Sequence, residues 1–456
     1  GLITVEDENF SVEDVFIYDS NSKFLTTPDK KGFYEFLTNK SEIKIVYLLV
    51  GSQFIEKQVM LNENNEVNID FKTKTEVLSE VVIKGQKIRE FQLKRLKEVE
   101  GTEIYSGKKT EVILVDQSMA NLASNNARQI YNQISGLNIY QNDDAGIQLH
   151  IGGRGLDPNR TSNFNTRQNS YDISADVLGY PESYYTPPAE AIKEIQIVRG
   201  AASLQYGTQF GGLINFVLKE PPNKKIDAVI RNTIGSNNQY TNFTSIGGKK
   251  NKFSFYAFYN HKRGDGFRNN SNYKSNNVYV HLKKNLSNKS ELSGEVTYMN
   301  YLAKQAGGLS DRMFINNPMQ SNRSRNWFEL DWLLYNFKFK HRFNEKTNLS
   351  FSLFGLDAER NTVGFRTNRV DQVDPLTERD LIRGNFNNHG IELKILRKYK
   401  INEKKGTFVL GGKYYRSKSL SKQGPGSEGS DADFNIYLDE FPNYSNQSNY
   451  IYPNKN

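Results

Sequence analysis

The chain of 456 residues has room for two to four domains and contains no cysteine, which excludes disulfides and thiolate metal sites. Hydrophobic residues make up 37% of it, and because no run of about 18 apolar residues occurs, a transmembrane helix is excluded. Residues 1–80 hold 8 Lys and Arg against 15 Asp and Glu, a net charge of −7. Because the whole chain has a net charge of +9, the remaining residues carry +16. The Lys and Arg residues of that part fall between predicted strands, which disfavours nucleic-acid binding.

Residues 1–73 are predicted to form a small β-sandwich. Strand-like runs alternate there with turns rich in Asn, Asp, Lys and Pro. The turn and strand at Thr27–Phe36 resemble those of the carboxypeptidase-regulatory-like domain, and no catalytic constellation accompanies them, so no peptidase activity is implied. The predicted strands are Val15–Asp19, Gly32–Phe36, Ile43–Val50, Gln58–Leu61 and Val67–Phe71.

Residues 74–109 are predicted to be a charged linker that contains one β-prone segment. Val81, Val82 and Ile83 supply the β propensity, and Glu80 belongs to their polar flank. One interpretation is a further strand of the sandwich. The other is a detachable segment that adds to the edge of a partner's sheet, which requires a backbone that is not already paired. The position of the segment between two predicted domains favours the second interpretation.

Residues 110–221 are predicted to form a compact α+β domain. Ser124 or Asn125 can cap a helix at Ala127–Ile134, which Gly136 would end. Pro188 suits the first turn of a second short helix. The glycine-rich turn at 152–155 lacks the spacing of a phosphate-binding loop. The predicted strands are Leu137–Tyr140, Gln148–Gly152, Glu194–Val198 and Leu213–Leu218.

From residue 222 to 456 the chain is predicted to consist of long antiparallel strands, so the fold class is all-β dominated. Period-two alternation extends over about nine to eleven residues, the span of a tilted membrane strand, and short and long connections alternate as in an outer-membrane barrel. A soluble sandwich is the alternative, although its strands are usually shorter. The predicted strands are Ile226–Ile234, Tyr240–Gly247, Lys252–Asn260, Asn277–Lys284, Glu291–Tyr301, Leu330–Phe343, Asn348–Leu356, Gly390–Tyr399 and Thr407–Tyr415.

Three segments of the α+β region carry a resemblance to a known family. They are Arg128–Ile139, the segment Ile151–Arg160 that contains Arg154 and Gly155, and the run Ile195–Tyr206. These segments resemble the plug of TonB-dependent outer-membrane receptors of the ferric dicitrate or siderophore type. The resemblance implies an importer rather than an enzyme, with a plug inside a transmembrane barrel. Such a barrel has about 22 strands, so the chain is expected to be a fragment.

The resemblance also implies roles for particular residues. It implies a TonB box at Glu80, Val81, Val82 and Ile83. It implies structural roles in the plug for Arg154, Gly155, Arg199, Gly200, Tyr206 and Gly207. We expect Arg199 to pair with a barrel-wall carboxylate such as Glu295.

Ligand is expected to bind between the plug apex, taken as Arg154–Asn169, and the long loops. Arginine forks suit the carboxylate oxygens of a ferric chelate. For each polar residue the alternatives are a hydrogen bond between plug and barrel, or solvation. The candidates are Arg160, Asn163, Asn165, Arg167 and Gln168 in the plug, and Arg263, Arg312 and Arg323 in the loops.

The remaining expectations concern partners, cofactors and location. No nucleotide motif occurs, so the energy for release would come from a periplasmic partner, the TonB–ExbB–ExbD complex, in the outer membrane of a Gram-negative bacterium. Iron would enter only as a transported chelate, because the five histidines are dispersed and Asp143-Asp144 is interpreted as a turn. Open alternatives are import of another chelate, cobalamin or a glycan, or a different class of protein. A passive porin should lack the plug, and an adhesin should lack the Glu80–Ile83 box and the Arg154-Gly155 element.

Overall fold

The computed structural model divides into two compact units, Gly1–Lys87 and Ile88–Asn456. The predicted box Glu80, Val81, Val82 and Ile83, as well as Gly200 and Gly207, lie outside the described residues. No helix in the described part of the chain is long and apolar enough to cross a membrane. The structure describes residues 1–6, 11–20, 24–39, 42–49, 53–60, 66–71, 94–106, 109–118, 120–177, 180–199, 204–206, 211–367, 369–402, 404–435 and 448–455.

The first unit is a small β-sandwich whose two sheets share one core. A four-stranded sheet has the order β3-β2-β4-β5, and β1 and β6 pair in parallel. Ile3 and Phe71 from the small sheet pack in the same buried cluster as Ile17 and Ile45 from the large one. The elements are β1 (Ile3–Val5), the 3-10 helix η1 (Val12–Asp14), β2 (Val15–Asp19), β3 (Phe24–Thr26), β4 (Glu42–Leu49), β5 (Gln53–Met60) and β6 (Ile69–Phe71).

The predicted strand Gly32–Phe36 is wrong. The Asp29 side chain accepts hydrogen bonds from the backbone N–H groups of Lys31 and Phe33, which folds the segment into a turn. Gly32 adopts a φ of +87°, a conformation that favours glycine and does not continue a strand. Phe33 forms only an isolated bridge to Leu2.

The second unit begins with an α+β body, called the plug body here (residues 94–221), which is built on a five-stranded sheet. Its order is β13-β12-β15-β14-β9, with β12 and β15 parallel and the other pairs antiparallel. Two hairpins, β7–β8 and β10–β11, lie outside this sheet. The strands are β7 (Val99–Glu100), β8 (Glu103–Ile104), β9 (Thr110–Leu114), β10 (Leu137–Tyr140), β11 (His150–Gly153), β12 (Phe164–Gln168), β13 (Tyr171–Asp172), β14 (Ile192–Arg199) and β15 (Gly212–Leu218).

The helices of the plug body are shorter than the sequence suggests. The helix predicted at Ala127–Ile134 is only one turn, and Asn126 caps it rather than Ser124 or Asn125. Asn125 cannot be the cap, because its φ is +55° and its side chain instead joins Gly146, Pro187 and Ala189. The helices are α1 (Ala127–Ile130) and the 3-10 helices η2 (Val115–Gln117), η3 (Asn159–Thr161), η4 (Ala189–Ala191) and η5 (Leu204–Tyr206).

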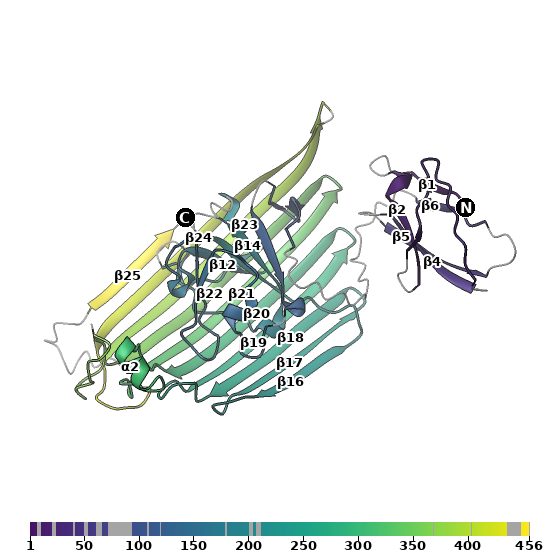
Figure 1. Cartoon of the computed structure of the whole chain (residues 1–456). Helices are drawn as coiled ribbons and strands as arrows, with labels where there is room; N and C mark the ends of the chain where they lie inside the picture. Colours follow the sequence, from purple (N-terminus) through teal and green to yellow (C-terminus); the bar gives the residue numbers. More distant parts are fainter. Residues whose placement is uncertain are drawn as a thin grey trace. The chain divides into compact units, whose positions relative to one another are not determined.

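The rest of the unit is one antiparallel sheet of ten strands in sequence order, β16 to β25 (Figure 1). All nine predicted strands are present, most extend into the predicted loops, and β25 was not predicted. Among the described residues β16 and β25 do not pair with each other. The strands are β16 (Asp227–Ile234), β17 (Tyr240–Lys250), β18 (Phe253–Gly264), β19 (Tyr273–Ser287), β20 (Ser290–Lys304), β21 (Trp327–Asn344), β22 (Thr347–Gly364), β23 (Asp380–Ile401), β24 (Lys404–Pro425) and β25 (Ser448–Lys455).

The two ends of this sheet differ in their connections. At one end, called the short-turn end, two-residue turns join β17 to β18, β19 to β20, β21 to β22 and β23 to β24. At the other, called the long-loop end, longer segments join β18 to β19, β20 to β21 and β22 to β23, and the second of these carries helix α2 (Asp311–Asn316). The alternation predicted from the sequence is therefore confirmed.

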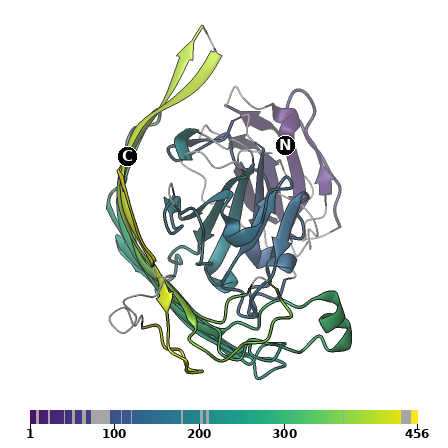
Figure 2. The same cartoon turned by 90° about the vertical axis from the view of Figure 1, so that its left-hand side faces the viewer.

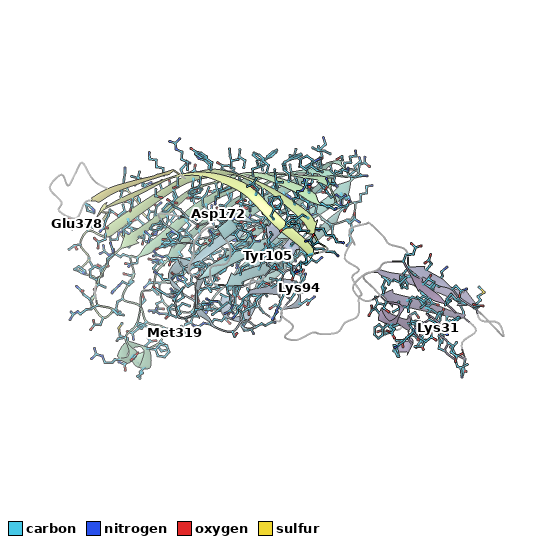
Figure 3. All side chains as sticks on the ribbon, turned by 90° about the horizontal axis from the view of Figure 1, so that it is seen from above. Lys31, Lys94, Tyr105, Asp172, Met319 and Glu378 are labelled. Atoms are coloured by element: carbon cyan, nitrogen blue, oxygen red, sulfur yellow. The ribbon has the colours of Figure 1, made fainter. Side chains whose placement is uncertain are left out.

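The sheet is curved, and the plug body lies in its concavity (Figure 2). Side chains stand on both faces (Figure 3). Val280, Val296 and Phe337 are exposed on the outer face, while their neighbours on the inner face, such as Tyr279 and Thr297, are fully buried. Period two thus separates an apolar outer face from an inner face that packs on the plug body.

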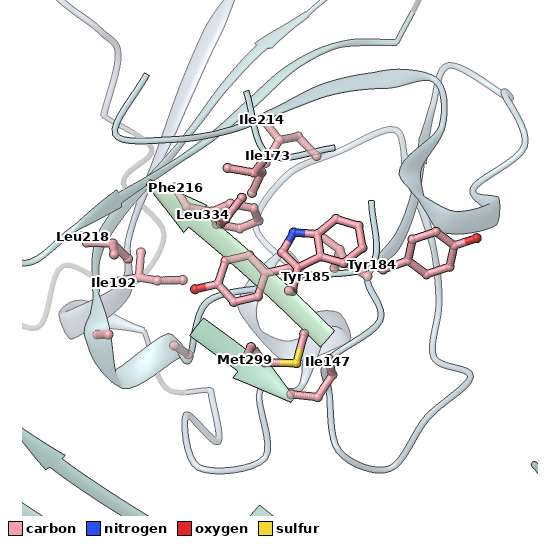
Figure 4. Packing of buried hydrophobic residues seen from close by; sticks show 14 of the residues in the cluster. Ile147, Ile173, Tyr184, Tyr185, Ile192, Ile214, Phe216, Leu218, Met299 and Leu334 are labelled. Carbon is pink, nitrogen blue, oxygen red and sulfur yellow. The ribbon is translucent and has the colours of Figure 1, made fainter. Parts of the chain in front are cut away.

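One buried cluster joins the plug body to the inner face of the sheet (Figure 4). Tyr184, Tyr185 and Phe216 from the plug body pack there with Met299 of β20 and Leu334 of β21. Because the cluster includes side chains from both parts, plug body and sheet form a single packed unit.

Candidate functional site

The most chemically specific group near the long-loop end of the plug body is built around the short helix η3. Arg160 and Thr161 adopt positive φ values of 49° and 56°. The buried Thr161 hydroxyl holds this bend, because it donates to the Leu149 carbonyl at 2.7 Å and accepts from the Ile151 N–H at 3.3 Å. The bend fixes the point from which the Arg160 side chain leaves the backbone.

Arg160 lies against an acidic and aromatic neighbourhood, called the apex cluster here and comprising Arg160, Tyr180, Glu182, Tyr184 and Arg360. The Arg160 Nη1 donates to Glu182 Oε2 at 2.8 Å, and its guanidinium carbon is 5.2 Å from the centre of the Tyr184 ring. The Tyr184 hydroxyl donates to the same carboxylate oxygen, and its oxygen is 3.0 Å from that of Tyr180.

The sheet contributes the second guanidinium of the cluster. Arg360 of β22 has its guanidinium carbon 5.7 Å from the centre of the Tyr184 ring and 5.7 Å from that of Phe328. Its buried Nε–H has no hydrogen-bond partner in the part of the chain that is described. The apex cluster therefore places two guanidinium groups against one tyrosine ring, and Arg160 is paired with the Glu182 carboxylate. Two neighbouring guanidinium groups can accept a further anionic group.

Sequence reasoning found Arg160 and missed Arg360. The signal that could have found Arg360 is the alternation of β22, because Phe354, Leu356 and Ala358 share its face and are buried against the plug body. Because every second side chain of a strand lies on the same face, Arg360 points inward like Phe354, Leu356 and Ala358.

His150 of β11 supports the backbone of Arg160. Its Nδ1 accepts a hydrogen bond from the Arg160 N–H at 3.0 Å, which requires an unprotonated Nδ1. Burial, and then the positive charge of Arg160, lower the pKa of His150 to about 4, although Glu182 and Asp157 act in the opposite direction. The ring is therefore neutral at physiological pH.

This environment predicts a pH dependence of stability. Because the folded pKa of about 4 lies below the unfolded value of about 6.5, the unfolded state binds more protons between them, and stability falls as pH falls through this window. His150→Asn keeps an acceptor in place of Nδ1 and removes the titration. The thermal midpoint of the parent should therefore drop relative to that of the variant between pH 7 and 4, and superimposable pH profiles would contradict the assignment.

Three of the predicted ligand residues lie in β12 and are buried: Asn165, Arg167 and Gln168. Their donors bond within the protein: Asn165 donates to the Tyr206 carbonyl, and Gln168 to Thr297 of the sheet. Asn163, just before the strand, donates to the Asp157 carbonyl. The geometry gives these residues internal partners, so the candidate ligand site retains only Arg160 from the plug set.

Arg167 belongs to a second group nearer the short-turn end, called the base cluster here: Glu103, Tyr105, Arg167, Tyr206 and Lys394. Arg167 forms a buried ion pair with Asp172 at 2.9 Å and lies 4.9 Å from the centre of the Tyr206 ring. The Glu103 carboxylate accepts from the hydroxyls of Tyr105 and Tyr206 and is 3.6 Å from Lys394 of β23.

The charge state of the base cluster is set by these contacts. Burial by itself would raise the pKa of Glu103, but Lys394 and the two tyrosine hydroxyls outweigh it and hold the pKa below its usual value. Glu103 is therefore an anion, 14% exposed in its side chain, that joins the start of the plug body to both its interior and the sheet. Losing it is costly, because the buried Lys394 would keep only one of its two carboxylate partners, Glu392.

The predicted loop arginines have different surroundings. Arg263 of β18 lies on the outer face, 5.6 Å from the Tyr240 ring, because its neighbour Lys262 points inward to the Ala145 carbonyl. Arg312 is exposed on α2. Arg323 is buried and donates to the carbonyls of Gln372 and Val370, so it joins two of the long loops.

The prediction that Arg199 pairs with Glu295 is wrong. Arg199 instead pairs with Glu111 at 2.6 Å and donates to the Ser135 carbonyl, both within the plug body. The reason is the sheet order: β14 lies beside β9, which carries Glu111. Glu295 accepts from Asn169, Tyr279 and Asn336.

Other plug positions fit tight turns. Arg154 and Gly155 adopt φ values of 58° and 78° directly after β11. Gly212 has a φ of +117°, and a Cβ there would approach the Val198 carbonyl oxygen to 2.1 Å, so the start of β15 beside β14 requires glycine.

No group of three or more His, Cys, Asp or Glu side chains suited to a metal ion occurs among the residues for which the structure gives positions. The Asp143 carboxylate instead accepts from the backbone N–H groups of Ile147 and Gln148, and that of Asp144 accepts from the N–H of Phe267. Asp143 thus serves a local turn, whereas Asp144 bonds to the segment that joins β18 to β19.

Comparison with known families identifies the plug body. Residues 107–213 match the family described as TonB-dependent Receptor Plug Domain. A comparison with curated protein sequences finds no significant match.

Solved structures share the fold of plug and sheet. The unliganded ferric citrate transporter FecA matches with 20% identity and a TM-score of 0.62, covering 72% of this chain and 50% of FecA. BauA, the ferric preacinetobactin receptor of Acinetobacter baumannii, matches with 13% identity and a TM-score of 0.58, covering 80% and 54%. The copper transporter OprC matches with 13% identity and a TM-score of 0.54, covering 71% and 48%. The chain thus spans about half the length of these proteins, and its resemblance to TonB-dependent receptors is confirmed.

Proposed function

We propose that this chain, which has the plug and sheet of a TonB-dependent receptor, imports a ferric siderophore of the ferric-citrate type into the periplasm of a Gram-negative bacterium. The observation that carries the proposal is a plug body packed in the concavity of a sheet whose outer face is apolar. Such an outer face suits lipid, and a plugged polar interior suits selective uptake rather than passive flow. The plug speaks against the porin alternative.

The apex cluster is the proposed contact for the chelate. Arg160 and Arg360 flank Tyr184, and the Arg160 side chain is only half-buried. A citrate-like chelate presents carboxylate oxygens that guanidinium forks bind in pairs. Cobalamin and neutral glycans offer no such carboxylate array, so the arginine pair favours an anionic chelate. Iron is cargo in this scheme, and the protein is a transporter rather than an enzyme.

Energy coupling is proposed to begin at Glu80, Val81, Val82 and Ile83, which would add as a strand to TonB, energised by ExbB and ExbD. The described chain resumes at Lys94 and reaches the base cluster at Glu103. A force applied before Lys94 would act first on the contacts that Lys94 and Leu96 make with β9 and with Glu194. It would then reach Glu103, whose loss would leave Lys394 without one of its carboxylate partners, Glu392 being the other.

Binding and uptake of ferric citrate test the proposal. The full-length protein, expressed in a host lacking its own ferric citrate receptor, should bind radio-iron-labelled ferric citrate and support growth with it as the iron source. Binding and uptake of another chelate with none of ferric citrate would replace the proposed cargo. Free passage of unrelated small solutes through the protein would contradict the importer assignment.

A further inference from the structure

A polar hollow separates the plug body from the inner face of the sheet at the short-turn end. Its volume is about 240 Å³. On the sheet side it is lined by inward residues of β19 to β22, including Lys283, Glu291 and Lys338. On the plug side it is lined by the β7–β8 hairpin and by β14 and β15.

This hollow continues toward the short-turn end. A neighbouring hollow of about 500 Å³ includes the turn residues 288–289 and shares Gly101, Thr102, Glu291 and Lys340 with the first. In the first hollow carboxylates and ammonium groups are nearly balanced, and Lys283 lies 2.8 Å from Glu291, which is also 3.5 Å from Lys340. The neighbouring hollow is basic, because Lys249, Lys252, Lys289, Lys340 and Arg342 line it together with one carboxylate, Glu291. A solute that follows this path therefore meets a polar lining that becomes more positive toward the short-turn end.

At its other end the hollow meets the tip of the β12–β13 hairpin. Asn169 and Ser170 form a tight turn with φ values of 46° and 74°. The Asn169 side chain donates to Glu295 at 2.6 Å, and the Asn169 backbone carbonyl accepts from the Lys338 ammonium group at 2.8 Å. The tip is thus held by β20 and β21 across the hollow.

Beyond the tip, toward the long-loop end, the inner face of the sheet is buried against the plug body. On β21 and β22 the residues Trp332, Leu334 and Leu356 make it largely apolar. On β18 to β20 polar side chains lie among buried apolar and aromatic ones such as Tyr279, Met299 and Tyr301, and these polar side chains are Thr297, Asn277, Asn260, Ser275 and Lys262. Asn260 pairs in register with Asn277, and Lys262 pairs with Ser275.

The buried polar groups beside these strands have few partners within the described chain. The Tyr185 hydroxyl interacts with the side chains of Asn277 and Thr297, and the facing Gln168 Oε1 has no hydrogen-bond partner there. Buried polar groups without partners are uncommon and costly in native proteins. Exposure to a hydrophilic solute and its water would satisfy them.

We propose that the imported solute leaves along the inner face of β18 to β20, and that the Asn169–Ser170 tip is the gate closing this route in the resting protein. The proposal rests on the import function above. In the resting protein the tip is bonded to Glu295 of β20 and Lys338 of β21, so it must withdraw before a chelate passes along these strands into the hollow. The rest of the plug body can keep its packing on β21 to β24 while this happens.

Cross-linking tests the gate against departure of the whole plug. Because the chain has no cysteine, the pair Asn169→Cys and Glu295→Cys can be bridged by a short bis-thiol reagent. The matched control bridges Asp176→Cys and Ser417→Cys, another contact between plug and sheet, at β24. The first bridge should lower radio-iron uptake from ferric citrate at least about tenfold, reversibly on reduction, without loss of binding, and the control bridge should leave uptake near the unbridged rate. Block by both bridges, or by neither, would overturn the gate.

Thiol labelling provides a readout that needs no cargo. Ser293→Cys lines the hollow and should react with a small hydrophilic thiol reagent, whereas Thr297→Cys, four residues along the same face of β20, should be protected. Releasing the tip by Asn169→Gly with Glu295→Gln should expose Thr297→Cys. Continued protection there, or an unreactive Ser293→Cys, would contradict the route even if ferric citrate proves to be the wrong cargo.

Discussion

Replacing Arg160 or Arg360 by glutamine is expected to weaken ferric citrate binding by about 10- to 100-fold each. A hydrogen bond to a charged group contributes about 1.5–3 kcal/mol, and 1.4 kcal/mol corresponds to a factor of ten. Both guanidinium groups lie on the Tyr184 ring, so the two variants remove neighbouring parts of one anion site. Titration calorimetry with the full-length protein measures the change.

A control variant separates specific recognition of the chelate from long-range attraction by the net positive charge. Arg312→Gln removes an equal charge from the exposed helix α2 and should leave affinity nearly unchanged. Lysine at 160 or 360 should restore only part of the affinity, because an ammonium lacks the planar fork. Equal weakening by all three glutamine variants would point to long-range attraction and would refute a specific apex site.

Deleting Glu80–Ile83 is expected to abolish uptake and leave ferric citrate binding intact. Binding is assigned to the apex cluster, whereas release needs an external pull on the segment before the plug. Because added strands bind through backbone N–H groups, Val82→Pro should also block uptake, while Val82→Thr, which keeps the N–H and the β propensity, should not. Radio-iron uptake and surface binding, measured on the same cells, distinguish the two steps.

Two outcomes would count against the coupling scheme. Loss of binding in the deletion variant would show that the segment supports the receptor itself rather than an energy partner. Normal uptake in Val82→Pro would show that strand addition at this position is not needed.

The long strands of the sheet could be predicted because their alternation is produced by two different surroundings. Val280 and Phe337 face outward, and Tyr279 and Thr297 face the plug body, so the sequence records both faces. Strand ends were less clear, because near the long loops both faces carry polar residues. Asn276 on the outer face, for example, bonds to Tyr259 and Asn300.

The plug body shows where such reasoning fails. Strand β12 reads Phe-Asn-Thr-Arg-Gln and is buried along its whole length, so its polarity suggested an exposed apex. Its polar groups are satisfied by partners far apart in the sequence, such as Arg167 with the Tyr206 carbonyl and Gln168 with Thr297. Arg199 received the wrong partner because β9, which carries Glu111, was not predicted.

The central claim is that the outer face of the sheet meets lipid while its inner face holds the plug. Nitroxide labels on alternate residues of β21 test it most directly, with Leu333, Tyr335 and Phe337 for the outer face and Asn336 and Lys338 for the inner one. In reconstituted bilayers, the outer set should be accessible to oxygen dissolved in lipid, and the inner set should be shielded from it. Equal access of both sets to a water-soluble relaxing agent would contradict the claim.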